Sequence, residues 1–210
     1  MILSDKAYHL IKHKIVTLEL PPSSLIDEQQ LTEELSIGRT PVREALRQLA
    51  AEKLVTIVPR RGTFVADISI TDLQELWEVR WDLEGLAARL AAERIDRQHL
   101  EQMKALFDEF DQVVDERGGK AFMDIDDRFH HLLYQATHNK FLEDVLDRLY
   151  TLSARLWYMS LDRLSHQVVS EAIKEHTKVV EALEKRDAKE AERVIQRHIG
   201  TFQEKLRAAL

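Results

Sequence analysis

Four polar residues stand among apolar residues at helical spacing in the second half of the sequence. Asp126 and His130 are four residues apart, and His176 and His198 each interrupt a later apolar stripe. Residues four apart lie on one side of a helix, about 5–6 Å from each other, so Asp126 and His130 can chelate one ion. A buried carboxylate is costly unless a cation or a metal pairs with it, and neutral imidazole is the commonest metal ligand. The pattern therefore predicts a metal site made of Asp126, His130, His176 and His198.

The chemistry of this donor set limits the choice of metal. Three imidazoles and one carboxylate suit Zn²⁺ first, and Ni²⁺, Mn²⁺ or Fe²⁺ are further candidates. Such a set leaves coordination positions open, which water or the carboxylate of a small molecule can take. For any one of these histidines alone, a hydrogen-bonded core histidine is the simpler interpretation, so the metal hypothesis rests on all four residues together.

Arg80 is a second charged residue on an apolar stripe, beside Leu76, Trp77 and Leu83. An arginine that faces the core of a helical bundle needs an anion. One candidate is Glu84, four residues later. The other is the carboxylate of a bound effector, which a guanidinium can clamp with two hydrogen bonds. Both alternatives stay open, because one arginine can change its partner with the ligand state.

The elements that must position these residues are helices. From Thr71 onward the apolar residues recur with a helical period, and Gly118-Gly119, His138-Asn139 and Arg186-Asp187 mark the turns. Six helices are predicted, at about 72–93, 97–117, 120–137, 140–161, 168–186 and 188–209. Because short links between helices force antiparallel neighbours, this half is predicted to be an all-α antiparallel bundle.

The first third of the chain has a different pattern. Three short helices are predicted near 5–18, 28–35 and 39–52, with Asp27 capping the second and Thr40 capping the third. Two β-prone runs follow at 55–58 and 63–65, separated by a turn at 59–62. Three helices and a hairpin form a winged helix-turn-helix, whose third helix enters the major groove of DNA.

Charge supports a nucleic-acid partner for this part of the chain. The whole chain has 30 basic and 37 acidic residues and a net charge of −7, yet residues 37–66 contain six basic residues and two acids. An ordinary solvated basic face is the alternative interpretation. The predicted contacts to double-stranded DNA come from the third helix and the hairpin turn, namely Arg39, Thr40, Arg43, Arg47, Arg60 and Arg61.

Length and composition set the frame for these elements. The chain has 210 residues, of which 44% are hydrophobic and 32% charged, and it contains no cysteine. That excludes disulfides, thiolate metal sites and cysteine nucleophiles, and it fits a reducing cytoplasm. No signal peptide or membrane span is expected. We expect a DNA-binding domain at 1–66, a linker at 67–71 and a metal- and effector-binding dimerisation domain at 72–210.

The segment 31–46 reads LTEELSIGRTPVREAL, and the hairpin reads PRRGTFV at 59–65. These strings resemble the helix-turn-helix and wing of GntR-type transcriptional regulators, in the FadR branch with an all-helical FCD effector domain. The resemblance implies a homodimer on an inverted-repeat operator. It also implies that Asp126, His130, His176 and His198 bind the metal and that Arg80 lies in the effector cavity. Gly38 and Ser23 depart from the family, which has Ser and Gly there, so position 38 is left out of the DNA set.

The function expected from these observations is a DNA-binding transcriptional regulator, a repressor by resemblance, whose operator binding responds to a small carboxylate metabolite. A metal-dependent hydrolase or lyase on a helical bundle is the first alternative. It leaves the basic winged helix unexplained, and the sequence lacks HExxH and paired ExxH motifs. The second alternative is a DNA-architectural protein whose bundle only dimerises. We therefore expect a regulator and not an enzyme.

Overall fold

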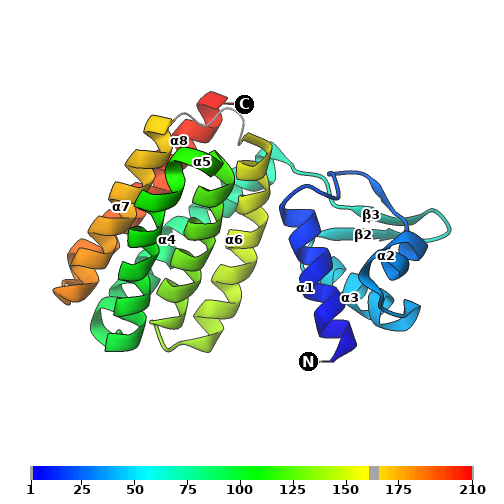
Figure 1. The fold of residues 1–210 in the computed structure, drawn as a ribbon, viewed down its shortest axis with the longest axis horizontal. Coiled ribbons are helices and arrows are strands. Elements are labelled where there is room, and N and C mark those ends of the chain that lie inside the picture. Colours follow the sequence, from blue (N-terminus) through cyan, green and yellow to red (C-terminus); the bar gives the residue numbers. More distant parts are fainter. Residues whose placement is uncertain (1, 161–165, 210) are drawn as a thin grey trace. The chain divides into compact units, whose positions relative to one another are not determined.

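The computed structural model describes residues 2–160 and 166–209 (Figure 1). The chain divides into two compact units. The first contains Met1–Ile70 with the short stretch Ala154–Tyr158, and the second contains Thr71–Ser153 and Met159–Leu210. Among the residues described, no helix is both long and apolar enough to cross a membrane.

The first unit is a winged helix-turn-helix, as predicted. Three helices pack beside a small antiparallel sheet in which β3 lies between β1 and β2. Pairing of Val55 with Val65 joins β2 to β3, and pairing of Leu25 with Phe64 joins β1 to β3. The elements are α1 (Leu3–Val16), β1 (Leu25–Ile26), α2 (Glu28–Leu35), α3 (Arg39–Ala51), β2 (Val55–Val58) and β3 (Gly62–Val65).

The ends of α2 are fixed by local chemistry. The carboxylate of Asp27 accepts hydrogen bonds from the backbone N–H groups of Gln29 and Gln30, at 2.8 and 3.0 Å. This confirms the predicted cap, which satisfies two N–H groups that have no partner inside the helix. The helix ends where Ser36 adopts a left-handed backbone with φ of 53°. The turn that follows leads into α3.

The start of α3 differs from the prediction. Gly38, not Thr40, is the N-cap residue, and no side chain caps this helix. Thr40 lies in the first turn and is exposed. Pro41 also lies in the first turn, where its missing N–H removes no helical hydrogen bond. The prediction of a Thr40 cap was therefore wrong, and its hydroxyl is not occupied by a cap bond.

Gly62 and Ser23 of the winged unit have a positive φ, a backbone conformation that favours glycine. Gly62 at the end of the wing turn has φ of 116°, and a Cβ there would lie 2.8 Å from Cδ1 of Leu25. Only glycine fits this position without strain. Ser23, where the resembled family has glycine, also has a positive φ of 62°. Serine therefore occupies a left-handed backbone position that glycine adopts more readily.

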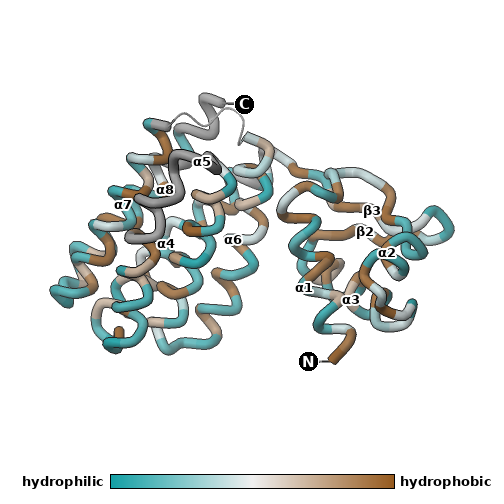
Figure 2. Tube along the Cα trace, viewed as in Figure 1, coloured by the Kyte–Doolittle hydropathy of each residue, from teal (hydrophilic) through white to brown (hydrophobic). Residues whose placement is uncertain are grey.

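The second unit is an all-α bundle, as predicted. Its helices are amphipathic, and hydrophobic and hydrophilic residues alternate along them in Figure 2. His138 and Arg186 have positive φ values of 48° and 54° and lie in the turns that join neighbouring helices. Helix α4 begins at Ile70, so the last two residues of the predicted linker are helical. The helices are α4 (Ile70–Arg94), α5 (Arg97–Gln135), α6 (Lys140–Ser160), α7 (His166–Glu184) and α8 (Ala188–Ala209).

Helix α5 corrects the prediction of a helix boundary at Gly118-Gly119. The chain is helical throughout Arg97–Gln135, including this pair. Nevertheless the rings of Phe107 and Phe129 lie 6.1 Å apart, whereas a straight helix would separate them by about 33 Å. Helix α5 is thus bent back on itself, and its two limbs lie side by side (Figure 1). The chain therefore reverses between Phe107 and Phe129, the stretch that contains the predicted glycine pair, without a break between two helices.

Candidate metal centre and nucleic-acid interface

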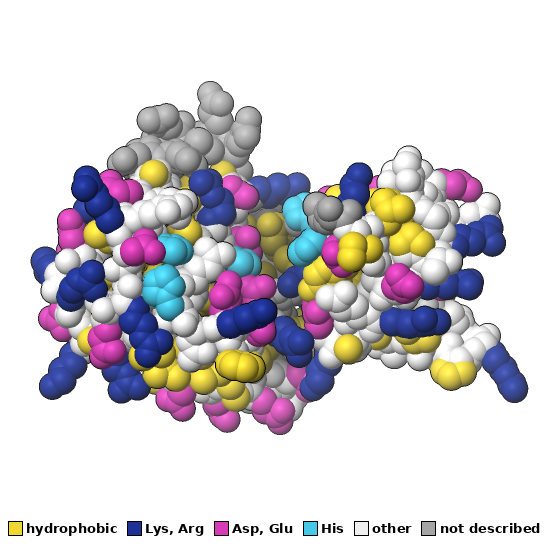
Figure 3. Space-filling view, turned by 90° about the horizontal axis from the view of Figure 1, so that it is seen from below, with side chains coloured by type: hydrophobic (Ala, Val, Ile, Leu, Met, Phe, Trp, Pro, Cys, Tyr) yellow, Lys and Arg dark blue, Asp and Glu magenta, His cyan; other side chains and the backbone are white. Residues whose placement is uncertain are grey.

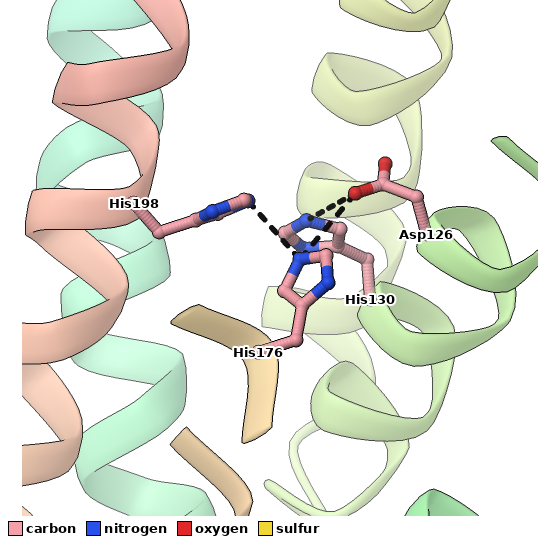
Figure 4. Close-up of side chains that lie close together, drawn as sticks. All are labelled: Asp126, His130, His176 and His198. Atoms are coloured by element: carbon pink, nitrogen blue, oxygen red, sulfur yellow. Dashed lines mark hydrogen bonds and ion pairs between the residues drawn. The ribbon is translucent and has the colours of Figure 1, made fainter. Parts of the chain in front are cut away.

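The four predicted metal ligands lie together inside the helical unit. One ligand atom from each lies within 4.8 Å of the others, and all four residues are buried. Asp126 and His130 come from the second limb of α5, whereas His176 comes from α7 and His198 from α8. Figure 4 shows the three imidazoles and the carboxylate pointing toward one another. The structure therefore brings together residues that are far apart in the sequence.

The distances between these atoms fit a single small cation. His176 Nε2 lies 3.1 Å from His198 Nε2 and 3.4 Å from Asp126 Oδ1. His130 Nε2 lies 3.9 Å from the same carboxylate oxygen. Ligand atoms that bind one zinc ion at about 2.0–2.2 Å are themselves separated by about 3–4 Å. These three pairs thus have the spacing of a coordination shell, and all four ligand atoms lie within 4.8 Å of one another.

The protonation and hydrogen bonding of the cluster also suit a metal. Asp126 Oδ2 accepts a hydrogen bond of 2.8 Å from the Tyr150 hydroxyl, but buried Oδ1 accepts none from the described residues. A buried carboxylate oxygen without a hydrogen-bond donor is costly unless a cation pairs with it. Burial, followed by the charges of His198 and His130, lowers the pKa of His176 well below its usual value. Its imidazole is therefore neutral at physiological pH, the form that binds metals.

The Nδ1 atoms of two of the imidazoles lie next to carboxylate oxygens. Nδ1 of His198 lies 3.0 Å from Oε2 of Glu175, within hydrogen-bond distance. Nδ1 of His130 lies 3.3 Å from Oε2 of Glu84 and 3.3 Å from the hydroxyl oxygen of Tyr134. Such outer partners fix the orientation of metal-binding histidines. Sequence reasoning did not identify Glu175, Tyr134 or Tyr150, because no motif marks them.

Arg80 is buried at 2% exposure and has anionic and neutral partners. Its Nε and Nη2 atoms donate to Oε1 of Glu84 at 3.2 and 2.5 Å, and Nη1 donates to Oγ of Ser153 at 2.6 Å. Burial is the largest single influence and acts to lower the pKa of Arg80, but the charges of Glu84, Tyr134 and Asp126 and the hydrogen bonds to Glu84 together outweigh it, so the pKa is raised. The pair with Glu84, one of the two alternatives for Arg80, is therefore present in this structure.

Glu84 connects Arg80 with the histidine cluster. Its side chain is fully buried, which by itself raises a carboxyl pKa. Interaction with His130 and with Arg80, together with the hydrogen bond from Tyr134, nevertheless holds the pKa of Glu84 below its usual range. Glu84 is therefore an anion in a site that excludes water. Arg80 is thus connected with the metal-ligand cluster through this carboxylate. It is also connected through Tyr150, whose ring centroid lies 5.5 Å from Cζ of Arg80 and whose hydroxyl donates to Asp126.

The six predicted DNA-binding residues are all exposed in the first unit. Arg39, Thr40, Arg43 and Arg47 lie on α3. Arg60 and Arg61 lie in the turn between β2 and β3. Of these, Arg43 has an ion pair within the unit, because its Nε lies 2.7 Å from Oε2 of Glu28 at the start of α2. Figure 3 shows Lys and Arg side chains projecting from the winged unit on the face drawn.

Comparison with known proteins assigns a known domain type to each unit. Residues 3–65 match the description "Bacterial regulatory proteins, gntR family", and residues 75–201 match the FCD domain. The chain is 27% identical over 205 residues to the HTH-type transcriptional repressor RspR of Escherichia coli, covering 98% of this chain and 89% of that one. It is also 27% identical over 211 residues to the E. coli repressor GlaR, covering 95% and 94%.

A solved structure supports the same fold. E. coli McbR/YncC superposes with a TM-score of 0.90 at 20% identity, covering 99% of this chain and 98% of that chain. The description matched by residues 3–65 and the names of both relatives concern transcriptional regulators, so this protein is a regulator, as its sequence predicts. The chain belongs to the GntR family of bacterial transcriptional regulators and carries an FCD domain in its C-terminal part.

Proposed function

We propose that this protein is a transcriptional repressor whose affinity for its operator changes when a small carboxylate metabolite binds at a metal centre in the helical domain. The observation that carries the proposal is the convergence of one carboxylate oxygen and three imidazoles within 4.8 Å, in a chain that begins with a GntR DNA-binding domain. Repression is proposed because RspR and GlaR are named repressors. In this proposal a domain boundary at 66 separates the two activities, and the predicted linker at 67–71 is shortened to 67–69 because α4 begins at Ile70.

In this proposal a homodimer binds an inverted repeat, because two-fold protein symmetry matches a palindromic operator. Helix α3 enters the major groove. There Arg39, Arg43 and Arg47 bind guanine edges or phosphates, and Thr40 contacts phosphate or a thymine methyl. Arg60 and Arg61 contact the backbone or the minor groove beside the wing. The protein acts in the cytoplasm, where a bacterial operator is found.

Asp126, His130, His176 and His198 would hold the metal, with Zn²⁺ as the first candidate and Ni²⁺, Mn²⁺ or Fe²⁺ as the others. When bound, the ion supplies open coordination positions for an oxygen ligand. The chain's own contribution is a buried pocket of three imidazoles and one carboxylate that Tyr150 orients. This donor set and its burial support a resident ion.

Arg80 is the proposed second anchor for the effector carboxylate. Because its donors already contact Glu84 and Ser153, effector binding requires Arg80 to exchange or share these partners. An effector changes operator affinity only if it binds one dimer arrangement more tightly than another. The exchange at Arg80 is a local change that can bias the packing of α4 against α6.

The experiment has two arms. Metal analysis of the purified full-length protein should give one transition-metal ion per chain, and the variant His176→Ala should lose it. Operator sequences selected from a random duplex library should then be bound more weakly when an organic acid from a broad panel is added. Absence of stoichiometric metal would leave a DNA-binding protein whose bundle only dimerises. Unchanged operator affinity across the panel would contradict the effector response.

A further inference from the structure

Glu84 has a different environment at each of its two carboxylate oxygens. Oε1 accepts three hydrogen bonds, from Nε and Nη2 of Arg80 at 3.2 and 2.5 Å and from the Tyr134 hydroxyl at 2.5 Å. None of the described residues donates a well-aligned hydrogen bond to Oε2, which lies 3.3 Å from Nδ1 of His130. The side chain is fully buried, so water cannot take the place of these partners.

We propose that Glu84 is a positioning residue for the metal: it keeps the proton of His130 on Nδ1 and so leaves Nε2 free to bind the ion. This inference rests on the proposed function, because it concerns the same metal. Arg80 and Tyr134 hold the carboxylate through Oε1, and Oε2 then faces the imidazole. Glu84 itself does not contact the metal-ligand atoms Nε2 and Oδ1.

The contacts of His130 favour this tautomer. Its Nδ1 lies near two acceptors, Oε2 of Glu84 and the hydroxyl oxygen of Tyr134. The Tyr134 proton is already directed to Oε1 of Glu84 at 2.5 Å, so neither neighbour has a proton to give to Nδ1. A proton on Nδ1 faces two acceptors at 3.3 Å and meets no competing donor. In a neutral imidazole the other nitrogen is then unprotonated, and this is Nε2, the atom that faces Asp126.

This arrangement links the proposed effector residue to a metal ligand through one carboxylate. Arg80 and His130 contact opposite oxygens of Glu84, so a change at the first alters the restraint on the second. An anion that draws Arg80 away from Oε1 frees the carboxylate to turn, and His130 then loses its fixed partner. Effector binding and metal affinity are therefore coupled through Glu84, and thermodynamic linkage makes that coupling reciprocal.

The substitution Glu84→Gln tests whether Glu84 keeps the proton of His130 on Nδ1, because Gln has nearly the same shape as Glu. The single amide oxygen stays at the Oε1 position, because three donors point there. The amide NH₂ group then occupies the Oε2 position and donates to Nδ1 of His130. This moves the imidazole proton to Nε2, the atom that the metal needs.

The first measurement is the tautomer of His130 in the metal-free, full-length protein labelled with ¹⁵N-histidine. Long-range ¹H–¹⁵N correlation at alkaline pH distinguishes the tautomers, and loss of one signal in a His130→Asn variant assigns the ring. We expect Nδ1–H in the unsubstituted protein and Nε2–H in Glu84→Gln. Nε2–H in the unsubstituted protein overturns the proposal, even if the variant does not fold.

The matched control is Glu175→Gln. Glu175 faces Nδ1 of His198 in the same way, at 3.0 Å, but its side chain is 18% exposed and no Arg–Tyr pair holds its other oxygen among the described contacts. Its amide can turn and present oxygen to the ring. We expect the His130 tautomer to be unchanged in this variant and the His198 tautomer to be kept.

The second measurement is metal affinity, by titration of Zn²⁺ against a competing chelator. Loss of an outer partner of a metal-binding histidine weakens binding about 10–100-fold, and we expect this for Glu84→Gln and a smaller loss for Glu175→Gln. The absorption spectrum of bound Co²⁺ should change in the first variant. Equal affinity and spectrum in Glu84→Gln overturn the positioning role alone, whereas no Zn²⁺ binding by the unsubstituted protein contradicts the proposed function itself.

Discussion

The arginines of α3 and the wing are exposed, whereas Arg80 of α4 is 2% exposed and has a defined partner for each donor group. The first group is solvated, screened by salt and able to turn toward DNA. Arg80 is stable in the core only because Glu84 and Ser153 contact it. The difference shows how burial decides what an arginine can bind. An exposed arginine can bind DNA directly, whereas the buried Arg80 can bind an effector only if it gives up or shares its contacts with Glu84 and Ser153.

The largest effect expected from this contrast is on stability. Arg80→Met should lower the free energy of unfolding by about 3–5 kcal/mol, because Glu84 is left as an uncompensated buried charge. Urea unfolding followed by circular dichroism measures this. Arg47→Met, the matched exposed change, should stay within about 0.5 kcal/mol. Equal stability of the two variants would contradict the contrast between buried and exposed arginines.

The next effect concerns the metal. Zn²⁺ at a free concentration about 1,000 times its Kd should stabilise the folded protein by about 4 kcal/mol. His176→Ala should remove this gain, because it removes a ligand that is neutral and ready to bind. The measurement is the rise in Tm on adding Zn²⁺ to protein treated with a chelator. His99→Ala, at a histidine outside the cluster, is the control, and an equal rise in both variants would count against the site.

A smaller effect is expected for the exposed arginines of α3. Arg43→Ala should weaken operator binding by about 1–3 kcal/mol and relax sequence preference at one position. Helical content should not change, because the side chain contributes only an exposed ion pair with Glu28. Fluorescence anisotropy with a selected operator measures the loss. Arg97→Ala on α5 is the control, and if it matches Arg43→Ala the recognition role is wrong.

The smallest effect is expected at the wing. Arg61→Ala should weaken binding to operator and unrelated DNA by similar factors, and the salt dependence should fall by about one counterion. This result would separate a backbone-contacting wing from a base-reading helix. Binding isotherms at several salt concentrations measure the slope. A loss confined to the operator would instead assign Arg61 to base recognition.

The sequence was informative where periodicity and local chemistry decide the structure. Helical spacing predicted that Asp126, His130, His176 and His198 face the interior, and the structure brings them together. Metal binding by them stays a prediction. Asp27 was identified as a cap because its role depends on residues next to it in the chain.

Features that depend on tertiary packing were not predicted. Tyr150 and Tyr134 contact Asp126 and Glu84 across helices, and no spacing in the sequence pairs them. Strand β1 has two residues and exists only through its pairing with β3, so it has no pattern of its own. The glycine pair at 118–119 indicated a chain reversal but could not show that helical structure continues through it.

The bend in α5 has a consequence for how the helical unit withstands unfolding. Asp126 and His130 come from the second limb of α5, and α7 and α8 supply one ligand each. A bound ion would therefore cross-link three segments that are distant along the chain. Closing such loops removes conformational entropy from the unfolded chain. The bound ion would thereby give a protein without cysteine a cross-link comparable to a disulfide. This cross-link does not depend on an oxidising compartment, and a chelator can remove it.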